Sequence, residues 1–138
     1  MASLSDAGCV FCAIVAGTSP SFRIAESDRA LAFLDINPAT EGHTLVIPKR
    51  HAVDIWDLDP EDGRAVWSLG QDVAAQLRDR LHPEGMTLFQ ANAAAGWQDV
   101  FHMHLHLVPR RTGDGLVKPW RIVAGDPDEL AGVADRLR

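Results

Sequence analysis

The sequence predicts an α+β domain, an antiparallel sheet of five strands with helices packed on one side of it. Three observations support this prediction. Short apolar runs divided by tight turns fill the first third of the chain, one long amphipathic segment follows, and two further strand-like runs come after it. Strands with short connections pair antiparallel, and helices that are grouped apart from them cover a face of the sheet.

Composition supports one domain and excludes several function classes. The chain has 138 residues, of which 46% are hydrophobic and 23% charged, and its net charge is −6. This acidic balance disfavours a nucleic-acid-binding protein, which needs clustered lysine and arginine. No run approaches the roughly 20 apolar residues of a membrane span, and the start lacks the pattern of a secretion signal. We therefore expect a cytoplasmic single domain over 1–138, with its core at about 9–110 and a C-terminal extension over 111–138.

The first part of the chain predicts one short helix and three strands. An apolar, compact run ending at Gly17 predicts the helix, and the polar turn at 26–28 divides the first two strands. Asn37-Pro38 breaks the chain before a β-branched run that ends at Pro48. The predicted elements are a helix over 8–16 and strands over 22–25, 29–35 and 43–48.

A long helix is predicted over 60–81. Asp59 is a good N-cap, Pro60 suits the first helical position, and the acidic residues that follow favour the positive end of the helix dipole. Apolar residues recur at helical spacing on one face: Val66, Leu69, Val73 and Leu77. The remaining predicted elements are strands over 86–91 and 100–109, a small-residue loop over 93–97 and a terminal helix over 127–137.

Three of the six histidines alternate along the last predicted strand. Because side chains of a strand alternate between its faces, His102, His104 and His106 share one face. The apolar residues between them face the core: Phe101, Met103, Leu105 and Leu107. Histidine titrates near neutrality and serves as a base, nucleophile or metal ligand, so this face predicts a reactive site. The alternative is a polar strand face that is merely rich in histidine.

Four segments carry a family resemblance: 9–17, 32–38, 42–51 and 98–110. In this order they resemble the signature of the histidine triad (HIT) family of nucleotide hydrolases and transferases, and its small Hint-like branch in particular. The resemblance implies a HIT-like fold that forms homodimers. It also implies cleavage at the α-phosphate of a purine nucleotide, such as a nucleoside phosphoramidate or a related adenylate, through a nucleotidyl-histidine intermediate.

The resemblance also assigns roles to individual residues. His104 matches the nucleophile, His106 the triad histidine that contacts a phosphate oxygen or the leaving group, and His43 a second histidine on the phosphate side. Asp35 matches the residue that binds the ribose hydroxyls, although a turn-initiating aspartate is the alternative. Positions matched to the base, the phosphate or the leaving group are Phe11, Phe33, Ile36, Asn92, Gln98 and Asp99.

A second set of residues fits a structural zinc ion. Cys9 and Cys12 lie three residues apart, and some proteins of the family bind zinc through this pair together with residues at the positions of His51 and His102. Two thiolates and two imidazoles form a tetrahedral zinc site. The alternative is a pair of buried free cysteines.

Two residues depart from the family pattern, and one lies outside it. Asp99 replaces a small hydroxyl residue beside the phosphate, where a carboxylate repels the substrate unless it faces away or pairs with Arg110 or Arg111. Trp97 replaces a glycine and narrows the leaving-group side or offers a stacking surface. Trp120, in the C-terminal extension, is a candidate to reach the partner's active site in a dimer, or else to pack on its own subunit.

Three other functions stay open at this point. A dinucleoside polyphosphate hydrolase or phosphorylase differs only in the leaving group. A nucleotide-binding regulatory protein with weak catalysis is favoured by Asp99. A metallohydrolase holding one ion on His102, His104 and His106 is disfavoured, because three alternate residues of a strand span roughly 13 Å, too far for metal–nitrogen bonds of about 2.0–2.1 Å.

Overall fold

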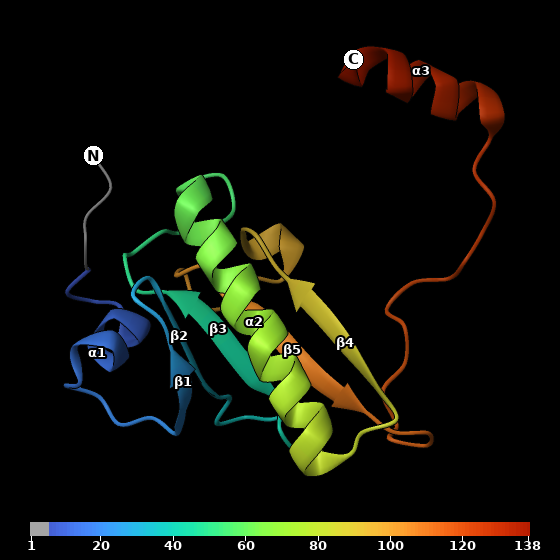
Figure 1. Ribbon diagram of the computed structural model, residues 1–138. Coiled ribbons are helices and arrows are strands. Elements are labelled where there is room, and N and C mark those ends of the chain that lie inside the picture. Colours follow the sequence, from blue (N-terminus) through green and yellow to red (C-terminus); the bar gives the residue numbers. More distant parts are fainter. Residues whose placement is uncertain (1–5) are drawn as a thin grey trace.

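The computed structural model describes residues 6–138 and confirms the α+β prediction (Figure 1). Five antiparallel strands form one sheet in the order β1-β2-β3-β5-β4. The strands are β1 (Arg23–Glu26), β2 (Ala30–Leu34), β3 (Thr44–Pro48), β4 (Gly85–Gln90) and β5 (Leu105–Arg110). The helices are α1 (Val10–Ala16), α2 (Pro60–Leu81), the short 3₁₀ helix η1 (Ala94–Gly96) and α3 (Pro127–Leu137).

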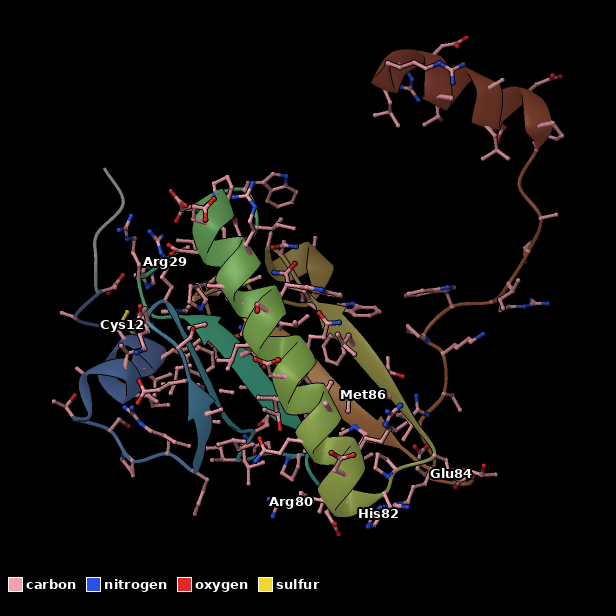
Figure 2. The ribbon with its side chains drawn as sticks, in the orientation of Figure 1. Cys12, Arg29, Arg80, His82, Glu84 and Met86 are labelled. Atoms are coloured by element: carbon pink, nitrogen blue, oxygen red, sulfur yellow. The ribbon has the colours of Figure 1, made fainter. Side chains whose placement is uncertain are left out.

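The long helix α2 covers one face of the sheet (Figure 1). It begins as predicted, with the Asp59 side chain accepting a hydrogen bond from the Glu61 amide at 2.8 Å. Near this end lies Arg29 of the β1–β2 turn, which Figure 2 labels. It pairs with the buried Asp62 at 2.9 Å. The apolar stripe of α2 packs on side chains from β2, β3 and β5 in a core that includes Ala30, Ala32, Val46, Val66, Leu69, Val73, Leu77, Leu105 and Leu107.

The opposite face of the sheet carries α1, so the prediction that helices lie on one side was wrong. Phe11 and Ile14 of α1 pack on the other side chains of β2 and β3, in a second cluster with Leu31, Phe33, Leu45 and Ile47. Because both faces are covered, β2 and β3 are buried along almost their whole length. A strand buried on both faces loses the polar–apolar alternation that distinguishes one side from the other in a sequence.

The last strand is shorter than predicted, because β5 begins at Leu105. The segment before it leaves the sheet: the Met103 amide donates to the Ala52 carbonyl at 2.7 Å. Met103 still faces the core beneath α2, but Phe101 is 51% exposed. Only His106 of the three histidines therefore lies in a strand, although all three are buried.

The C-terminal extension leaves the sheet through a fixed turn. Arg110 forms a two-bond ion pair with Asp114, and Arg111 donates to the carbonyls of Leu81, the last residue of α2, and of His82, which caps it. Beyond this turn α3 stands apart from the sheet and buries none of its residues (Figures 1 and 2). Trp120, in the connecting segment, is 67% exposed, so its own subunit leaves most of the side chain uncovered. Within 6–138, every helix falls short of the length and apolarity that a membrane crossing requires.

Candidate active site and metal site

A pocket opens on the α1 side of the sheet, beside two of the triad histidines. Its wall comes from α1, the 19–22 segment, the end of β2 with the loop after it, and the segment entering β5. Phe11 and Phe33 form an apolar side of the pocket, and their rings meet edge to face at 5.4 Å. Ile36 lies in the wall with 76% of its surface exposed. The pocket thus brings together the three apolar positions matched to the base.

His104 directs an unprotonated ring nitrogen, Nε2, into this pocket. Its Nδ1 donates to the carbonyl of His102 at 2.7 Å, so the neutral ring carries its proton there and leaves a lone pair on Nε2. The ring is 3% exposed, and the Phe11 ring packs edge-on against it at 5.2 Å. A fixed imidazole with a lone pair on the pocket side is the arrangement that nucleophilic attack requires.

His106 lies next to His104 on the pocket side and is held by Phe89 and His43. The Phe89 ring stacks on it at 3.9 Å with the planes 12° apart, and its Nδ1 lies 2.9 Å from Nε2 of His43. Burial lowers the pKa of His106 to about 3, with the neighbouring His104 and His43 adding to the effect. His106 is therefore a neutral ring throughout the physiological pH range.

His43 stands behind His106 and does not line the pocket. It precedes β3, and burial lowers its pKa as well. Asp35 links it to the pocket wall: one carboxylate oxygen lies 3.6 Å from His43 Nε2, and the other accepts the Asn37 amide at 2.8 Å. Asp35 thus initiates the turn and faces the pocket at once, so the two interpretations of this residue are compatible.

Asp99 brings a negative charge to the reactive nitrogen. Its carboxylate oxygen lies 3.6 Å from Nε2 of His104, and its side chain is 81% exposed. The Val100 amide donates to the same oxygen at 2.8 Å. The two arginines that could have neutralised it are engaged elsewhere, Arg110 with Asp114 and Arg111 with the end of α2. The carboxylate therefore faces His104 without an arginine partner.

Besides His43, the structure keeps two more of the sequence-predicted residues out of the pocket wall. The Gln98 amide is buried and bonds to the backbone at Ala93, Val53 and Val100. Asn92 exchanges hydrogen bonds with the Gln90 side chain and accepts the Ile55 amide at 2.8 Å. Both side chains hold loops together, and neither has a hydrogen-bonding atom directed at the pocket histidines.

Other residues of the site carried no recognised signal in the sequence. Phe89 stacks on His106 because the two are partners in the β4–β5 register. An aromatic residue at an exposed position of a strand was the only available indication. The 19–22 segment joins the wall through Phe22, which is 69% exposed. The exposure of this large apolar side chain beside a pocket is seen only in the structure.

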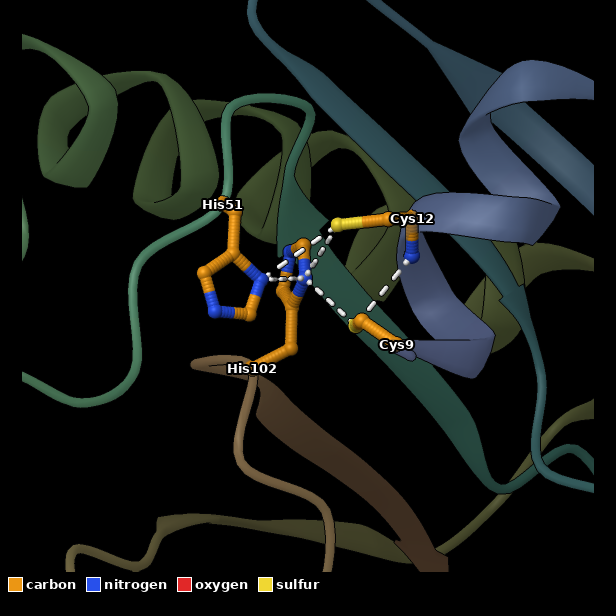
Figure 3. Close-up of side chains that lie close together, drawn as sticks. All are labelled: Cys9, Cys12, His51 and His102. Carbon is orange, nitrogen blue, oxygen red and sulfur yellow. Dashed lines mark hydrogen bonds between the residues drawn. The ribbon is translucent and has the colours of Figure 1, made fainter. Parts of the chain in front are cut away.

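The four residues of the expected zinc site converge in the structure (Figure 3). We call Cys9, Cys12, His51 and His102 the metal quartet. Their ligand atoms lie within 4.8 Å of one another, and four of the separations are 3.2, 3.3, 3.3 and 3.5 Å. A tetrahedral zinc ion with bonds of about 2.0–2.1 Å to nitrogen and about 2.3 Å to sulfur separates its ligand atoms by roughly 3.3–3.8 Å.

The hydrogen bonds around the metal quartet suit a metal ligand set. Nε2 of His102 lies 2.8 Å from the Pro48 carbonyl, which can only accept, so the lone pair of His102 is on Nδ1, toward the sulfur atoms. The backbone amides of Cys12 and Asp6 point at Sγ of Cys9 and Cys12, at 3.3 and 3.4 Å. Donors that orient ligands in this way are typical of metal sites.

Comparisons with known proteins agree with this geometry. The HIT domain matches residues 16–113. A member of the HIT family from Bacillus subtilis has a crystal structure with a TM-score of 0.88 to this chain, at 35% identity over 94% of both chains. A Zn-bound histidine triad family protein from Mycobacterium smegmatis gives 0.76, at 43% identity over 94% of this chain and 97% of its own.

A curated relative adds a named activity. The adenosine 5'-monophosphoramidase of Saccharomyces cerevisiae is 35% identical over 133 residues, which cover 96% of this chain and 82% of the yeast protein. Three observations agree on one family: the matched domain, the fold, and the pocket with its two triad histidines. The chain belongs to the histidine triad (HIT) family.

Proposed function

We propose that the protein hydrolyses nucleoside 5'-phosphoramidates or related adenylates of a purine nucleoside. The observation that carries this proposal is the bare Nε2 of His104 at the floor of a pocket that has an apolar side and a carboxylate, Asp35. An apolar slot suits a base, a carboxylate accepts hydrogen bonds from two ribose hydroxyls, and a fixed imidazole attacks phosphorus. The yeast relative carries the phosphoramidase activity in its name.

The reaction proceeds in two displacements. In the first, the Nε2 lone pair of His104 forms a bond to the α-phosphorus, the bond from phosphorus to the amine nitrogen breaks, and the amine takes a proton from solvent. In the second, water attacks the same phosphorus, the bond to Nε2 breaks, and the nucleoside monophosphate leaves while the proton of the water passes to solvent. Division of one displacement into two lowers the barrier of each step.

The charge of the pocket favours an amine leaving group over a polyphosphate. Its described wall contains two carboxylates, Asp35 and Asp99, and no lysine or arginine. A dinucleoside polyphosphate brings several negative charges that such a wall cannot neutralise, whereas the amine of a phosphoramidate leaves as a neutral or cationic group. Asp99 lies 3.6 Å from the attacking nitrogen, so its charge opposes the entry of a polyanion at this place.

A substrate panel tests the proposal. The purified protein is incubated with adenosine and guanosine phosphoramidates, an aminoacyl adenylate and dinucleoside polyphosphates, and the products are separated by chromatography. We expect release of the nucleoside monophosphate, fastest from the phosphoramidates. Binding of AMP without turnover of any compound would instead establish a regulatory nucleotide-binding protein, and preferred cleavage of the dinucleotides would establish the polyphosphate hydrolase.

We also propose that the metal quartet holds one structural zinc ion. The ligand separations and the two-thiolate, two-imidazole donor set support it, and a relative from Mycobacterium smegmatis is Zn-bound. With all four positions filled by protein atoms, the ion has no open site for substrate, so it fastens the N-terminal segment to the sheet. Thiol ligands of this kind persist in a reducing compartment, in agreement with a cytoplasmic protein.

A homodimer is the third part of the proposal. The strand β4 is an edge of the sheet and exposes Leu88 and Phe89, at 39% and 44%, and the outward side of α2 exposes Trp67 at 59%. An unpaired edge with apolar side chains is a template for pairing with a second copy. In that dimer Trp120 is available to contact the partner's pocket. Light scattering should give twice the chain mass of 15.0 kDa, and a monomer mass would contradict this part.

A further inference from the structure

A row of outward side chains precedes β5 at the border of the pocket. Exposure alternates along this segment: Trp97, Asp99 and Phe101 are exposed, with fractions of 68% for Trp97 and 51% for Phe101. Between them, Gln98 is buried and Val100 is half-buried. Because alternate residues of an extended segment share a side, the Trp97 indole lies on the same side of the segment as the Asp99 carboxylate.

This row begins close to the reactive nitrogen. Asp99 lines the pocket, and its carboxylate lies 3.6 Å from Nε2 of His104. Two residues of chain span at most about 7 Å, so the backbone of Trp97 lies within that distance of the Asp99 backbone. In a phosphoryl transfer the leaving group lies in line with the attacking atom, on the far side of phosphorus. It therefore points away from His104 toward the mouth of the pocket, where Trp97 stands.

Trp97 is held in a backbone conformation that opposes folding. Its φ is 76° and its ψ 18°, in the left-handed region that a bulky residue rarely adopts. Within residues 6–138, no aromatic ring pairs with the indole. The strained conformation thus presents a large apolar surface to solvent and gains little packing within the chain in return.

The loop around Trp97 is fixed by its neighbour. The Gln98 side chain accepts the Ala93 amide at 2.8 Å and donates to the carbonyls of Val53 and Val100. The Gln98 backbone amide donates in turn to the Ala93 carbonyl at 3.0 Å. These bonds hold the loop in one conformation, so a ligand that meets the indole loses little free energy in ordering it.

We propose that Trp97 is a specificity-determining residue, whose indole packs against the aromatic part of an amine leaving group. The inference rests on the proposed function for the reaction itself. An indole face binds a second ring by burial of apolar surface and by stacking. The neighbouring Asp99 carboxylate attracts a cationic amine and repels an anion. The substrate class is therefore a nucleoside phosphoramidate of an arylalkyl amine, in preference to one of ammonia or a small amine.

The test compares kcat/KM for two adenosine 5'-phosphoramidates, one of phenethylamine and one of methylamine. The wild type should prefer the phenethyl compound by about tenfold, and Trp97→Phe should keep most of this preference. Trp97→Gly should reduce it to about twofold or less, while its rate with the methyl compound stays near that of the wild type. An equal preference in the wild type and Trp97→Gly would overturn the inference.

Stability distinguishes this role from a structural one. Glycine adopts a positive φ without strain, so Trp97→Gly should raise the midpoint of chemical denaturation. Trp56→Gly is the matched control, because it removes an indole that is 78% exposed from a turn outside the left-handed region. It should change neither the substrate preference nor raise the midpoint. A lower midpoint in Trp97→Gly would contradict the inference, because it would show that the indole packs within its own fold.

A binding experiment separates this inference from the proposed reaction. Calorimetry measures the affinities of two adenosine 5'-sulfamides that are not hydrolysed, with the same phenethyl and methyl groups on nitrogen. The wild type should bind the phenethyl compound more tightly, Trp97→Gly should bind both alike, and AMP should bind equally to both proteins. Because no turnover is required, the affinity ratio is readable even if the substrate panel fails. Equal affinities in the wild type would overturn the inference.

Discussion

The metal quartet and the pocket take imidazoles from the same five-residue segment, yet these imidazoles have different chemistry. In His102 the Pro48 carbonyl binds Nε2 and frees Nδ1 toward two sulfur atoms. In His104 the bonds are reversed, and Nε2 is free toward the pocket. Burial is similar for both rings, so it does not distinguish the proposed metal ligand from the proposed nucleophile. The partner of the other nitrogen decides the role.

The largest effect should come from loss of the free nitrogen in the pocket. His104→Ala removes the attacking atom, so we expect kcat to fall by about 10⁴-fold or more while AMP binding changes little. His82→Asn, at the exposed end of α2 and outside both sites, is the control and should retain its rate. Near-normal hydrolysis by His104→Ala would remove the basis of the proposed mechanism.

Loss of a ligand from the metal quartet should lower the stability of the fold and leave the rate of the reaction almost unchanged. His51→Asn deletes one ligand, so the protein should lose its zinc and about 3 kcal/mol or more of unfolding free energy. The rate per folded molecule should change far less. Metal analysis and chemical denaturation measure the two quantities, with His82→Asn as the matched control. Full zinc content in His51→Asn would contradict the ligand assignment.

A third prediction concerns the acid side of the stability curve. The pKa of folded His106 is about 3, below the ordinary value near 6.5, so between these values the unfolded chain binds a proton that the folded chain does not. The contribution of this ring is full above pH 6.5 and is lost as the pH falls. The stability difference between wild type and His106→Asn should shrink by up to about 1.4 kcal/mol per pH unit from pH 6 to 4. A constant difference would show that the ring is not held neutral.

The smallest effect, a change in substrate preference, should come from removal of the Asp99 carboxylate at the pocket. Asp99→Ser restores the small hydroxyl that the family resemblance implies, and we expect the preference for phosphoramidates over dinucleoside polyphosphates to decrease about fivefold. Competition between the two substrates measures this ratio. Asp72→Asn makes the same charge change on exposed α2 and should leave the ratio as it is. An unaltered ratio in Asp99→Ser would show that another feature selects the leaving group.

Alternation along the chain was enough to predict that the three histidines share a face, and the cysteine spacing with family order was enough to predict the metal quartet. The boundaries of the two longer helices followed from their caps and prolines, and both 60–81 and 127–137 were placed as observed. These features depend on residues that are close together in the sequence, so they can be recognised in a single sequence.

The free nitrogen of each histidine was beyond sequence reasoning, because distant backbone groups determine it. The Pro48 carbonyl meets His102 across 54 residues, and a bond between side chains 63 residues apart orients His106. For the same reason the sequence did not predict the position of Gln98, whose amide ties three loops together. It did not predict the position of Phe89 either, because Phe89 meets His106 only in the β4–β5 register.

The central claim is that His104 alone attacks phosphorus, through Nε2. Wild-type protein is mixed with a phosphoramidate labelled in its nucleoside, and the reaction is quenched after a brief interval under conditions that preserve bonds between phosphorus and histidine. Mass spectrometry of the peptides then locates the label. The account predicts one nucleotidyl group on His104 and none on His102 or His106; a label on either neighbour, or turnover with no labelled histidine, would contradict it.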